Sequence, residues 1–332
     1  MEKVRIGIFG VGHLGKIHTR LLKEIEGYEV VGFYDPDDKN AEKAIADFGI
    51  TRYTDPDKLI ADSDAVDIVS PTITHHKLAY DAIKQTRHVF IEKPLANTLA
   101  EAKEIVSLAT EANVKAMVGH VERFNPALLS LDTKHMNPMF IEVHRLAEFN
   151  PRGTDVSVVL DLMIHDIDII LSLVKGNVKK VSASGVAIIS KSPDIANARI
   201  EFDNGCVANV TASRISVKNM RKMRIFQPGA YISMDFLKKK SDIFKIDDTK
   251  PMNGEEEMPH FELDLQDNTK KYISFETAEK KDVNAIKMEL ELFHKAIVEN
   301  KPVPVSVLDG YNAMHVAHQI LDKINKQLML KK

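Results

Sequence analysis

The amino-acid sequence predicts an α/β protein with an N-terminal Rossmann-type doubly wound parallel sheet and a C-terminal α+β domain on a mostly antiparallel open sheet. Three observations lead to this fold class. Apolar strand-like segments alternate with helical segments over residues 1–120, a glycine-rich turn follows the first strand, and strands of alternating polarity dominate the chain after residue 175. A chain of 332 residues also exceeds one ordinary hydrophobic core, so two domains are expected.

The first 120 residues are predicted to form repeated strand–helix units. The expected strands are 3–10, 28–35, 50–55, 65–71, 88–94 and 114–120. The expected helices are 13–25, 55–63, 74–86 and 97–113. Most of these strands are apolar throughout, which is typical of a parallel sheet covered on both faces.

The pattern changes after His120. An apolar helix is expected over 156–174, and two helices over 283–299 and 308–327 end the chain. Between them the sequence predicts a loop at 252–260 and strands at 178–190, 196–204, 206–216, 220–228, 230–236, 242–247 and 270–276. Alternating polarity in several of these strands predicts an antiparallel sheet with one covered and one open face. An open face favours self-association, so a homodimer or homotetramer is expected.

Composition excludes several classes of function. The net charge of −3 gives no basic surface for nucleic acid or an anionic membrane, and no apolar run is long enough to span a bilayer. The start of the chain has no signal-peptide pattern, which predicts a cytoplasmic protein. The single cysteine, Cys206, excludes an intramolecular disulfide and a thiolate zinc site. His75 and His76 are adjacent and do not converge, so no metal site is predicted.

A glycine-rich turn between the first strand and the first helix predicts a dinucleotide site. Its glycines, Gly10, Gly12 and Gly15, follow the G-x-G-x-x-G pattern, and Asp35 ends the next strand. The helix N-terminus would bind the pyrophosphate and Asp35 the adenosine ribose. A carboxylate repels a 2′-phosphate and the following residues include no arginine, so NAD is favoured over NADP, while Lys39 keeps NADP open as the alternative. The predicted contacts in this turn also include Val11, His13 and Leu14.

Further cofactor contacts are expected where the later parallel strands end, because doubly wound sheets bind ligands at that edge. These residues are Ser70, Pro71, Thr72, His75, Glu92 and Lys93. Lys93 would also hydrogen-bond a substrate oxygen and stabilise the negative charge that develops there. The alternative is a surface lysine paired with Glu92.

Three polar residues on one face interrupt the apolar helix at 156–174. Asp161, His165 and Asp168 are spaced i, i+4 and i+7, so an α-helix would align them. Burying such groups is costly unless they are paired or functional. These three residues therefore either include a satisfied Asp–His pair in the core or line a catalytic site, in which Asp161 orients His165 for proton transfer.

Taken together, GVGHLG, Asp35, the EKP sequence ending at Pro94 and the D-x-x-x-H spacing resemble the glucose-fructose oxidoreductase and inositol dehydrogenase family, Gfo/Idh/MocA. The resemblance covers nearly the whole chain. It implies a catalytic group of Lys93, Asp161 and His165. It also implies an NAD-binding domain at 1–120, a substrate-binding and oligomerisation domain at 121–307, and a C-terminal helix at 308–332 that returns to the first domain.

Two longer stretches, 118–127 and 155–170, resemble family members that oxidise UDP-linked N-acetylhexosamines at the 3-position. This resemblance implies substrate contacts from Arg123, Asn125 and Arg152, together with Lys93 and His165. Arginine suits phosphate because its planar fork binds oxyanions bidentately, although an interdomain salt bridge is an equal alternative for each arginine.

The expected activity is therefore oxidation of a ring hydroxyl of a sugar or nucleotide sugar, with hydride transfer to NAD. Three alternatives stay open at this point. The chain could act on free sugars or inositol, hydrolyse glycosides through transient oxidation by NAD, or bind nicotinamide nucleotide without turnover.

Overall fold

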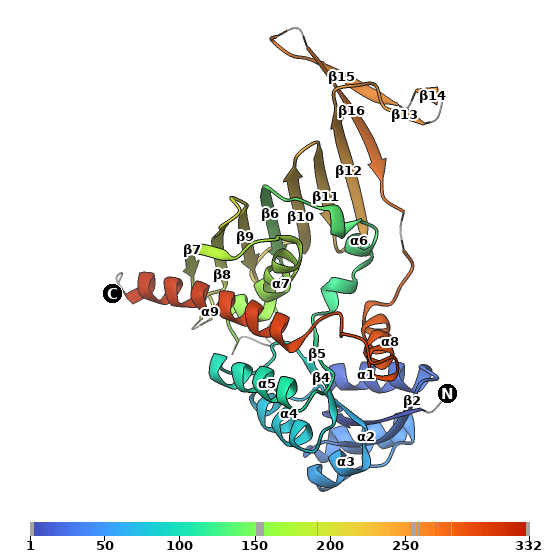
Figure 1. Ribbon diagram of the computed structural model, residues 1–332. Helices are drawn as coiled ribbons and strands as arrows, with labels where there is room; N and C mark the ends of the chain where they lie inside the picture. The colour runs from blue at the N-terminus through green and yellow to red at the C-terminus, as the bar shows by residue number, and fades with distance from the viewer. Residues whose placement is uncertain are drawn as a thin grey trace. The chain divides into compact units, whose positions relative to one another are not determined.

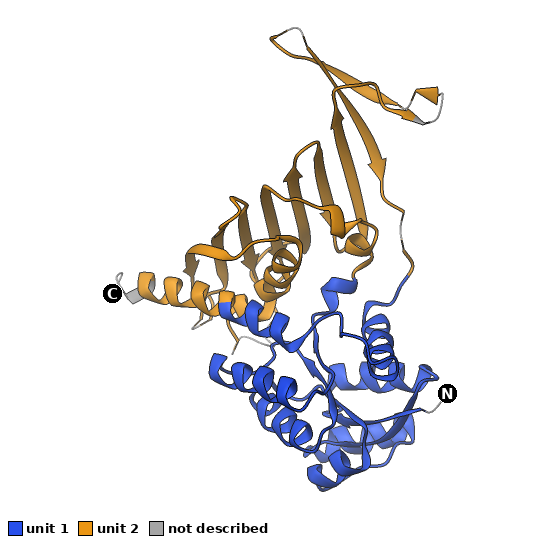
Figure 2. Ribbon diagram, in the orientation of Figure 1, with its two compact units in different colours: residues 1–124, 283–315 blue, residues 125–282, 316–332 orange. Residues whose placement is uncertain are grey.

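The computed structural model describes residues 3–150, 156–190, 192–253, 256–257, 259–267, 269–279 and 281–329 (Figure 1). The chain forms two compact units, and each is continued by a segment from the C-terminal part of the sequence (Figure 2). Unit 1 comprises Met1–Phe124 and Val283–His315, and unit 2 comprises Asn125–Asp282 and Val316–Lys332. The domain boundaries predicted after residues 120 and 307 stay predictions.

Unit 1 contains the predicted parallel sheet. Its strands lie in the order β2-β1-β3-β4-β5, and every neighbouring pair is parallel. The strands are β1 (Val4–Phe9), β2 (Tyr28–Tyr34), β3 (Ala65–Ile68), β4 (His88–Glu92) and β5 (Ala116–Gly119). The order reverses between β1 and β3, which gives a doubly wound sheet a crevice at its carboxyl edge.

The strand predicted at 50–55 is wrong. Only Arg52 pairs there, in an isolated bridge with Phe33. The segment ends at once because the Asp55 side chain accepts a hydrogen bond from the Asp57 amide and caps α3 (Pro56–Asp62). Pro56 suits the first turn of that helix, since its missing amide hydrogen would have no helical partner.

The other helices of unit 1 begin where the sequence supplies caps or turns. They are α1 (His13–Glu24), α2 (Asp38–Phe48), α4 (His75–Lys84), α5 (Leu99–Glu111) and α8 (Ala285–Val298), with short 3₁₀ turns η1 (Thr72–Thr74) and η2 (Val121–Phe124). Asp37 caps α2, and Thr98 with Glu101 forms a capping box at α5. The last helix, α9 (Val307–Met329), contributes residues to both units.

Unit 2 is built on a nine-stranded sheet in the order β15-β16-β12-β11-β10-β6-β9-β8-β7. All neighbouring strands are antiparallel except β6 and β9, which run parallel. The strands are β6 (Phe140–Leu146), β7 (Val178–Val186), β8 (Ile195–Phe202), β9 (Val207–Ser213), β10 (Met220–Gln227), β11 (Ala230–Asp235), β12 (Lys240–Asp247), β15 (His260–Asp264) and β16 (Lys270–Thr277). The predicted mostly antiparallel sheet is confirmed.

Three details of unit 2 differ from the expectation. Strands β6 and β15 were not predicted. Part of the predicted loop at 252–260 is paired, because β13 (Met252–Asn253) and β14 (Glu256–Glu257) form a short antiparallel ladder. The helix predicted over 156–174 begins as a π-helical turn, η4 (Val159–Met163), and continues as α7 (Ile164–Leu173).

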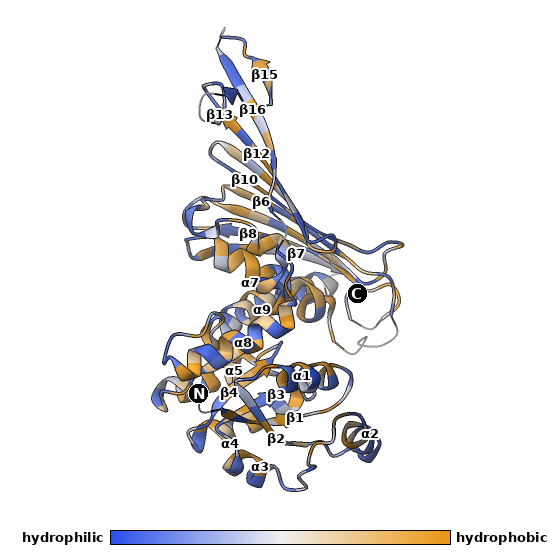
Figure 3. Cartoon of the chain, turned by 90° about the vertical axis from the view of Figure 1, so that its right-hand side faces the viewer, coloured by the Kyte–Doolittle hydropathy of each residue, from blue (hydrophilic) through white to orange (hydrophobic). Residues whose placement is uncertain are grey.

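One face of the unit 2 sheet is covered. Inward-facing side chains such as Ile141, Val143, Met223 and Ile225 are fully or almost fully buried. Helix α7 contacts β6 and β9 on this face, and α6 (Pro126–Leu129) contacts β11 and β12. Figure 3 shows α7 coloured largely as hydrophobic, as expected for a helix enclosed by its own unit.

A buried ion pair joins α7 to the sheet. Arg145 on β6 donates two hydrogen bonds to Asp166 on α7, at 2.7 and 2.8 Å, and both side chains are only 2% exposed. No role is predicted for Asp166 from the sequence. The structure shows that it anchors the helix that also carries His165.

Among the helices of the residues that the structure describes, none is long and apolar enough to cross a membrane.

Candidate active site

Unit 1 contains a cavity of about 790 Å³ at the carboxyl ends of its strands. The cavity is lined by the glycine-rich turn after β1, by the residues after β2, and by the loop after β3. Its lining includes Gly10, Gly12, Tyr34, Asp35, Pro36, Asp37, Asn40, Ser70, Pro71 and Thr74. This is the edge at which doubly wound sheets bind nucleotides.

The glycine-rich turn is shaped by close backbone contacts. Gly10 has a φ of +92°, and a Cβ there would lie 2.8 Å from the Ser70 Cα. A Cβ on Gly15 would lie 2.0 Å from the Gly10 carbonyl oxygen, whereas Gly12 has no atom within 4 Å of its Cβ position. The open space at Gly12 therefore lets a bulky ligand approach the main chain, which suits a dinucleotide pyrophosphate.

The N-terminus of α1 is available to an anion. Gly12 occupies the cap position and, among the residues that the structure describes, supplies no side-chain cap to the first amides. These amides, with the positive end of the helix dipole, suit a pyrophosphate. Of the three other predicted contacts in the turn, Val11 is buried, His13 is exposed and Leu14 is half-buried.

Asp35 is held in place by the main chain. Its carboxylate accepts hydrogen bonds from the amides of Val11 and Asp37, each at 2.9 Å, and the residue is 6% exposed. A carboxylate has more acceptor sites than these two bonds use, so Asp35 can also receive the hydroxyls of a ribose. The residues present therefore fit the adenosine half of NAD.

Arg52 was not predicted to lie near Asp35. Its guanidinium donates to the Asp35 carbonyl oxygen at 3.0 Å and pairs with Asp38 at 2.8 Å. No short-range pattern signals this placement, because Arg52 enters from the segment that follows α2.

The loop after β3 contains four predicted cofactor residues. Ser70 and Pro71 line the cavity and Thr72 begins η1. His75 is buried, and its ring nitrogens lie 3.0 Å from the Pro94 carbonyl oxygen and 2.9 Å from that of Ser70. His75 is not among the described lining residues of the cavity, and it joins the loop after β3 to the EKP segment.

Burial lowers the pKa of His75, and the nearby carbonyl groups only partly oppose that effect. His76 points elsewhere and pairs with Glu104 at 2.8 Å. The adjacent histidines therefore have separate partners, two carbonyl oxygens for His75 and the Glu104 carboxylate for His76.

Lys93 lies directly after β4 and is half-buried. Its backbone amide donates to the Glu92 carboxylate at 3.1 Å, and the peptide bond between Lys93 and Pro94 is cis. Glu92 is nearly buried, and its second oxygen lies 3.4 Å from His18 Nε2. Burial favours a raised pKa for Glu92, but His18 and Lys93 outweigh burial and lower it.

Unit 2 has its own polar cavity, of about 480 Å³, at the carboxyl ends of β6 and β9. These are the two parallel strands of its sheet, so the cavity occupies the same kind of strand edge that binds ligands in other open sheets. It is lined by Ala147, Glu148, Phe149, Asn150, Asp161, Leu162, Arg214 and Asn219. Asp161, predicted as catalytic, is therefore part of a cavity wall.

The π-helical turn changes the geometry expected for Asp161, His165 and Asp168. Asp161 lies within η4 and His165 in the first turn of α7, so the regular α-helical alignment assumed from their spacing does not hold. Both residues are half-buried, whereas Asp168 is buried. Single π-helical turns occur frequently at functional sites, where they redirect side chains.

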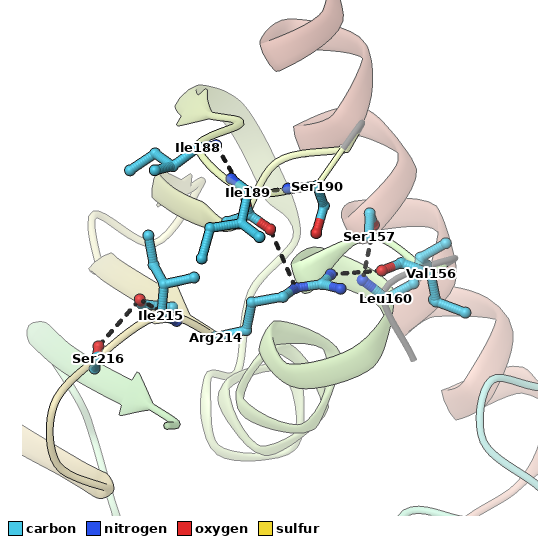
Figure 4. A network of polar contacts seen from close by, with 11 residues as sticks. Val156, Ser157, Leu160, Ile188, Ile189, Ser190, Arg214, Ile215 and Ser216 are labelled. Atoms are coloured by element: carbon cyan, nitrogen blue, oxygen red, sulfur yellow. Dashed lines mark hydrogen bonds and ion pairs between the residues drawn. The ribbon is translucent and has the colours of Figure 1, made fainter. Parts of the chain in front are cut away.

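Arg214 was not predicted, although it directly follows β9. Its guanidinium donates to the Val156 carbonyl oxygen (Figure 4). Its Nε lies 4.0 Å from an oxygen of Asp194. Asp194 also accepts hydrogen bonds from the amides of Ile188, Ile189 and Ser190. Burial favours a raised pKa for Asp194, but hydrogen bonds from this loop outweigh it and hold the pKa well below its usual range.

The predicted substrate residues have different surroundings. Arg123 in η2 lies 3.7 Å from Asp309, within unit 1. Asn125 caps α6 by accepting from the Ala127 amide, and it donates to the Phe236 carbonyl oxygen at 3.2 Å. Arg152 lies outside the described residues.

Comparison with known proteins places the chain in a family. Residues 4–120 match the model of the Gfo/Idh/MocA oxidoreductase family with an NAD-binding Rossmann fold, and residues 128–229 match the C-terminal domain of that family. The chain is 37% identical to a UDP-N-acetylglucosamine 3-dehydrogenase of Acidithiobacillus ferrooxidans, over 71% of this chain and 75% of that protein. It is 30% identical to scyllo-inositol 2-dehydrogenase (NAD(+)) of Bacillus subtilis, over 65% of this chain and 68% of that protein.

A solved structure of the Acidithiobacillus ferrooxidans UDP-N-acetylglucosamine 3-dehydrogenase is similar over 98% of both chains, with a TM-score of 0.86 and 32% identity. The family resemblance predicted from the sequence is thereby confirmed. The chain belongs to the Gfo/Idh/MocA family and is an NAD-binding oxidoreductase that acts on CH–OH groups.

Proposed function

We propose that this enzyme oxidises the 3-hydroxyl of a UDP-linked N-acetylhexosamine to a ketone. The observation that carries this proposal is the similarity of the whole chain, at 32% identity, to a UDP-N-acetylglucosamine 3-dehydrogenase. The polar cavity of unit 2 supports it, because Glu148, Asn150 and Asn219 offer hydrogen-bonding groups suited to a sugar.

In the proposed reaction His165 takes the hydroxyl proton of the substrate. Lys93 donates a hydrogen bond to the same oxygen and stabilises its developing negative charge. Asp161 orients His165 and favours its protonated form. The Gly10–Gly15 turn and Asp35 would hold NAD, which would supply the acceptor for the hydride of the substrate carbon. Oxygen thus loses a proton, carbon loses a hydride, and a C=O bond forms.

The diphosphate of such a substrate needs cationic partners. Arg214 lines the cavity of unit 2, which makes it a candidate alongside the predicted Arg152. Arg123 has Asp309 nearby in the same unit, which favours a salt bridge within unit 1 for that residue and not the interdomain bridge of the sequence analysis. The contacts of Asn125 with Ala127 and Phe236 support a structural role beside its predicted role in substrate binding.

A comparison of substrates tests this proposal. We measure kcat/KM by the formation of NADH. We expect the value for UDP-N-acetylglucosamine to exceed that for myo-inositol and free hexoses by at least about 100-fold, because a site built to bind the nucleotide and N-acetyl groups rejects analogues that lack those groups. Turnover of only the free polyols would support the second candidate, an inositol dehydrogenase like the Bacillus subtilis relative. Release of an aglycone without net NADH would instead indicate the glycosidase mechanism.

We also propose that the enzyme forms a homodimer or homotetramer through the open face of the unit 2 sheet. Five aromatic rings follow one another across neighbouring strands on this face, with centroid separations of 4.9 to 6.0 Å. They are Phe140, Phe226, Tyr231, Phe244 and Phe275. Phe226 and Phe275 are 42% and 49% exposed, which is typical of an apolar surface covered by a partner.

Replacing Phe226 by lysine is expected to convert the oligomer to smaller species, because a charge in the centre of a desolvated interface lacks a partner. Light scattering coupled to size exclusion measures the mass. Val217, which is 90% exposed and outside the aromatic row, provides a matched control as Val217→Lys. An unchanged mass for Phe226→Lys, or a monomeric wild-type enzyme, contradicts the proposed interface.

A further inference from the structure

Four ionisable side chains from four elements meet in the core of unit 1. They are His18 on α1, Asp67 on β3, Glu92 on β4 and Glu289 on α8, and none is more than 8% exposed. His18 Nδ1 lies 3.0 Å from Asp67, and His18 Nε2 lies 3.4 Å from Glu92. One ligand atom from each of His18, Glu92 and Glu289 lies within 4.8 Å of the others. The cluster therefore contains three carboxyl groups and one imidazole.

The surroundings of His18 favour a charged ring. Nδ1 is hydrogen-bonded to Asp67 at 3.0 Å. Nε2 makes no hydrogen bond to the residues that the structure describes but lies 3.4 Å from Glu92, so a second N–H would point an attractive charge toward that carboxylate. Burial alone would lower the pKa of His18, but the charge and hydrogen bond of Asp67, with the charge of Glu92, outweigh it and raise the pKa well above its usual value. An imidazolium here offsets one of the three buried carboxyl groups.

The surroundings of Glu289 favour the uncharged form of its side chain. Within the part of the chain that the structure describes, neither of its carboxyl oxygens has a hydrogen-bond partner, and the residue is 0% exposed. An ionised carboxylate in that position would be strongly disfavoured, whereas a neutral acid is tolerated. Burial is the largest cause that raises its pKa, and the nearby charge of Glu92 adds to it.

The other charges around Glu289 are accounted for. His18 and Asp67 also act on it, with opposite effects on its pKa. The turn η2, which packs against α8, contributes Glu122 and Arg123. Glu289 is therefore surrounded mainly by acidic groups, and His18 is the cation within the cluster.

The cluster is connected to Lys93 through Glu92. One oxygen of Glu92 accepts the backbone amide of Lys93 at 3.1 Å, and the other faces His18. Gly119 on β5 leaves room for Glu92 in this position, because a Cβ on Gly119 would lie only 2.6 Å from the Glu92 Oε1. The charge and position of Glu92 thus fix the start of the EKP segment.

We propose that Glu289, as a neutral acid, and His18, as a cation, are positioning residues that keep Glu92 ionised and bound to the main chain of Lys93. The role in turnover rests on the proposed function of Lys93. The protonation of Glu289 itself does not depend on that function.

Infrared spectroscopy tests the protonation directly. The spectrum of wild type minus Glu289→Gln, recorded at pH 7, is expected to contain the carbonyl band of a buried protonated carboxylic acid, and this band should shift on isotope exchange in D₂O. Glu291→Gln is the matched control, since Glu291 is exposed on the same helix. Glu289→Met provides a second variant of similar length. Absence of the band, or a stoichiometric divalent metal that is lost in both Glu289 variants, would overturn the proposal.

The pH dependence of turnover tests the positioning role. Raising the pH through the raised pKa of Glu289 would place a second negative charge beside Glu92, so wild-type kcat should fall in alkali while Glu289→Gln keeps a higher kcat there. The KM for NAD should stay within about twofold, since the cluster does not line the nucleotide cavity. If kcat falls with rising pH in the same way in wild type and in Glu289→Gln, the positioning role is overturned. If the band is present but Lys93→Met retains activity, the function proposed for Lys93 fails instead.

Discussion

Replacing Lys93 by methionine is expected to lower kcat by about 10³-fold, because the variant loses a cation that stabilises charge at the reacting oxygen. Methionine keeps the length of the side chain and removes its charge. The carboxylate of Glu92 binds the backbone amide of Lys93, so the substitution leaves that anchor in place. Steady-state NADH formation measures kcat, and titration calorimetry measures the affinity for NAD, which we expect to change by less than about tenfold.

Lys103→Met serves as the control for this variant. Lys103 is exposed on α5, and the same chemical change there should leave kcat within about twofold of wild type. A Lys93→Met enzyme that keeps more than a tenth of the wild-type kcat would contradict the catalytic role of Lys93. It would support the alternative prediction, a surface lysine paired with Glu92.

Replacing Asp166 by alanine is expected to lower the free energy of unfolding by about 3 to 5 kcal/mol, because it leaves the guanidinium of Arg145 buried without its bidentate partner. Chemical denaturation with linear extrapolation measures the change. The exposed pair of Lys245 with Glu276 is the control, since Lys245→Met should cost far less.

The double variant Arg145→Met with Asp166→Leu separates charge from packing. Replacing both members of a buried pair by apolar residues is often close to neutral, so much of the loss should be recovered. A double variant as unstable as Asp166→Ala would show that the volume of the side chains, and not the unpaired charge, sets the cost.

Local patterns in the sequence were sufficient to predict the two sheets and their parallel or mostly antiparallel character. The five parallel strands of unit 1 and most strands of unit 2 follow from runs of apolar or alternating residues, which are short-range signals. The dinucleotide site follows from glycine spacing and Asp35 for the same reason. The predicted strand at 50–55 failed because a proline and a capping aspartate end the segment after one bridge.

Helix α2 and strands β6 and β15 were missed although they are local elements. The missed side-chain contacts depend on residues far apart in the chain. Arg145 and Asp166 pair across two elements, and Glu289 joins His18 only after α8 packs against α1. Arg52 reaches Asp35 in the same way. The π-helical turn at Asp161 has no periodic signature in an almost wholly apolar segment, so an α-helix was the natural expectation.

The parallel pairing of β6 with β9 has a consequence for the order of folding. Strands β7, β8 and β9 are sequential antiparallel neighbours, as are β10, β11 and β12, so each group can form from local contacts. Pairing of β6 with β9 brings Phe140 beside Val207 and must enclose η4, α7, β7 and β8 in one long loop. Such non-local contacts form late because their loop-closure entropy is large. The cavity lined by Asn150, Asp161 and Arg214 lies where these two strands end side by side, so we expect a partly folded chain to acquire its helices and hairpins before this cavity exists.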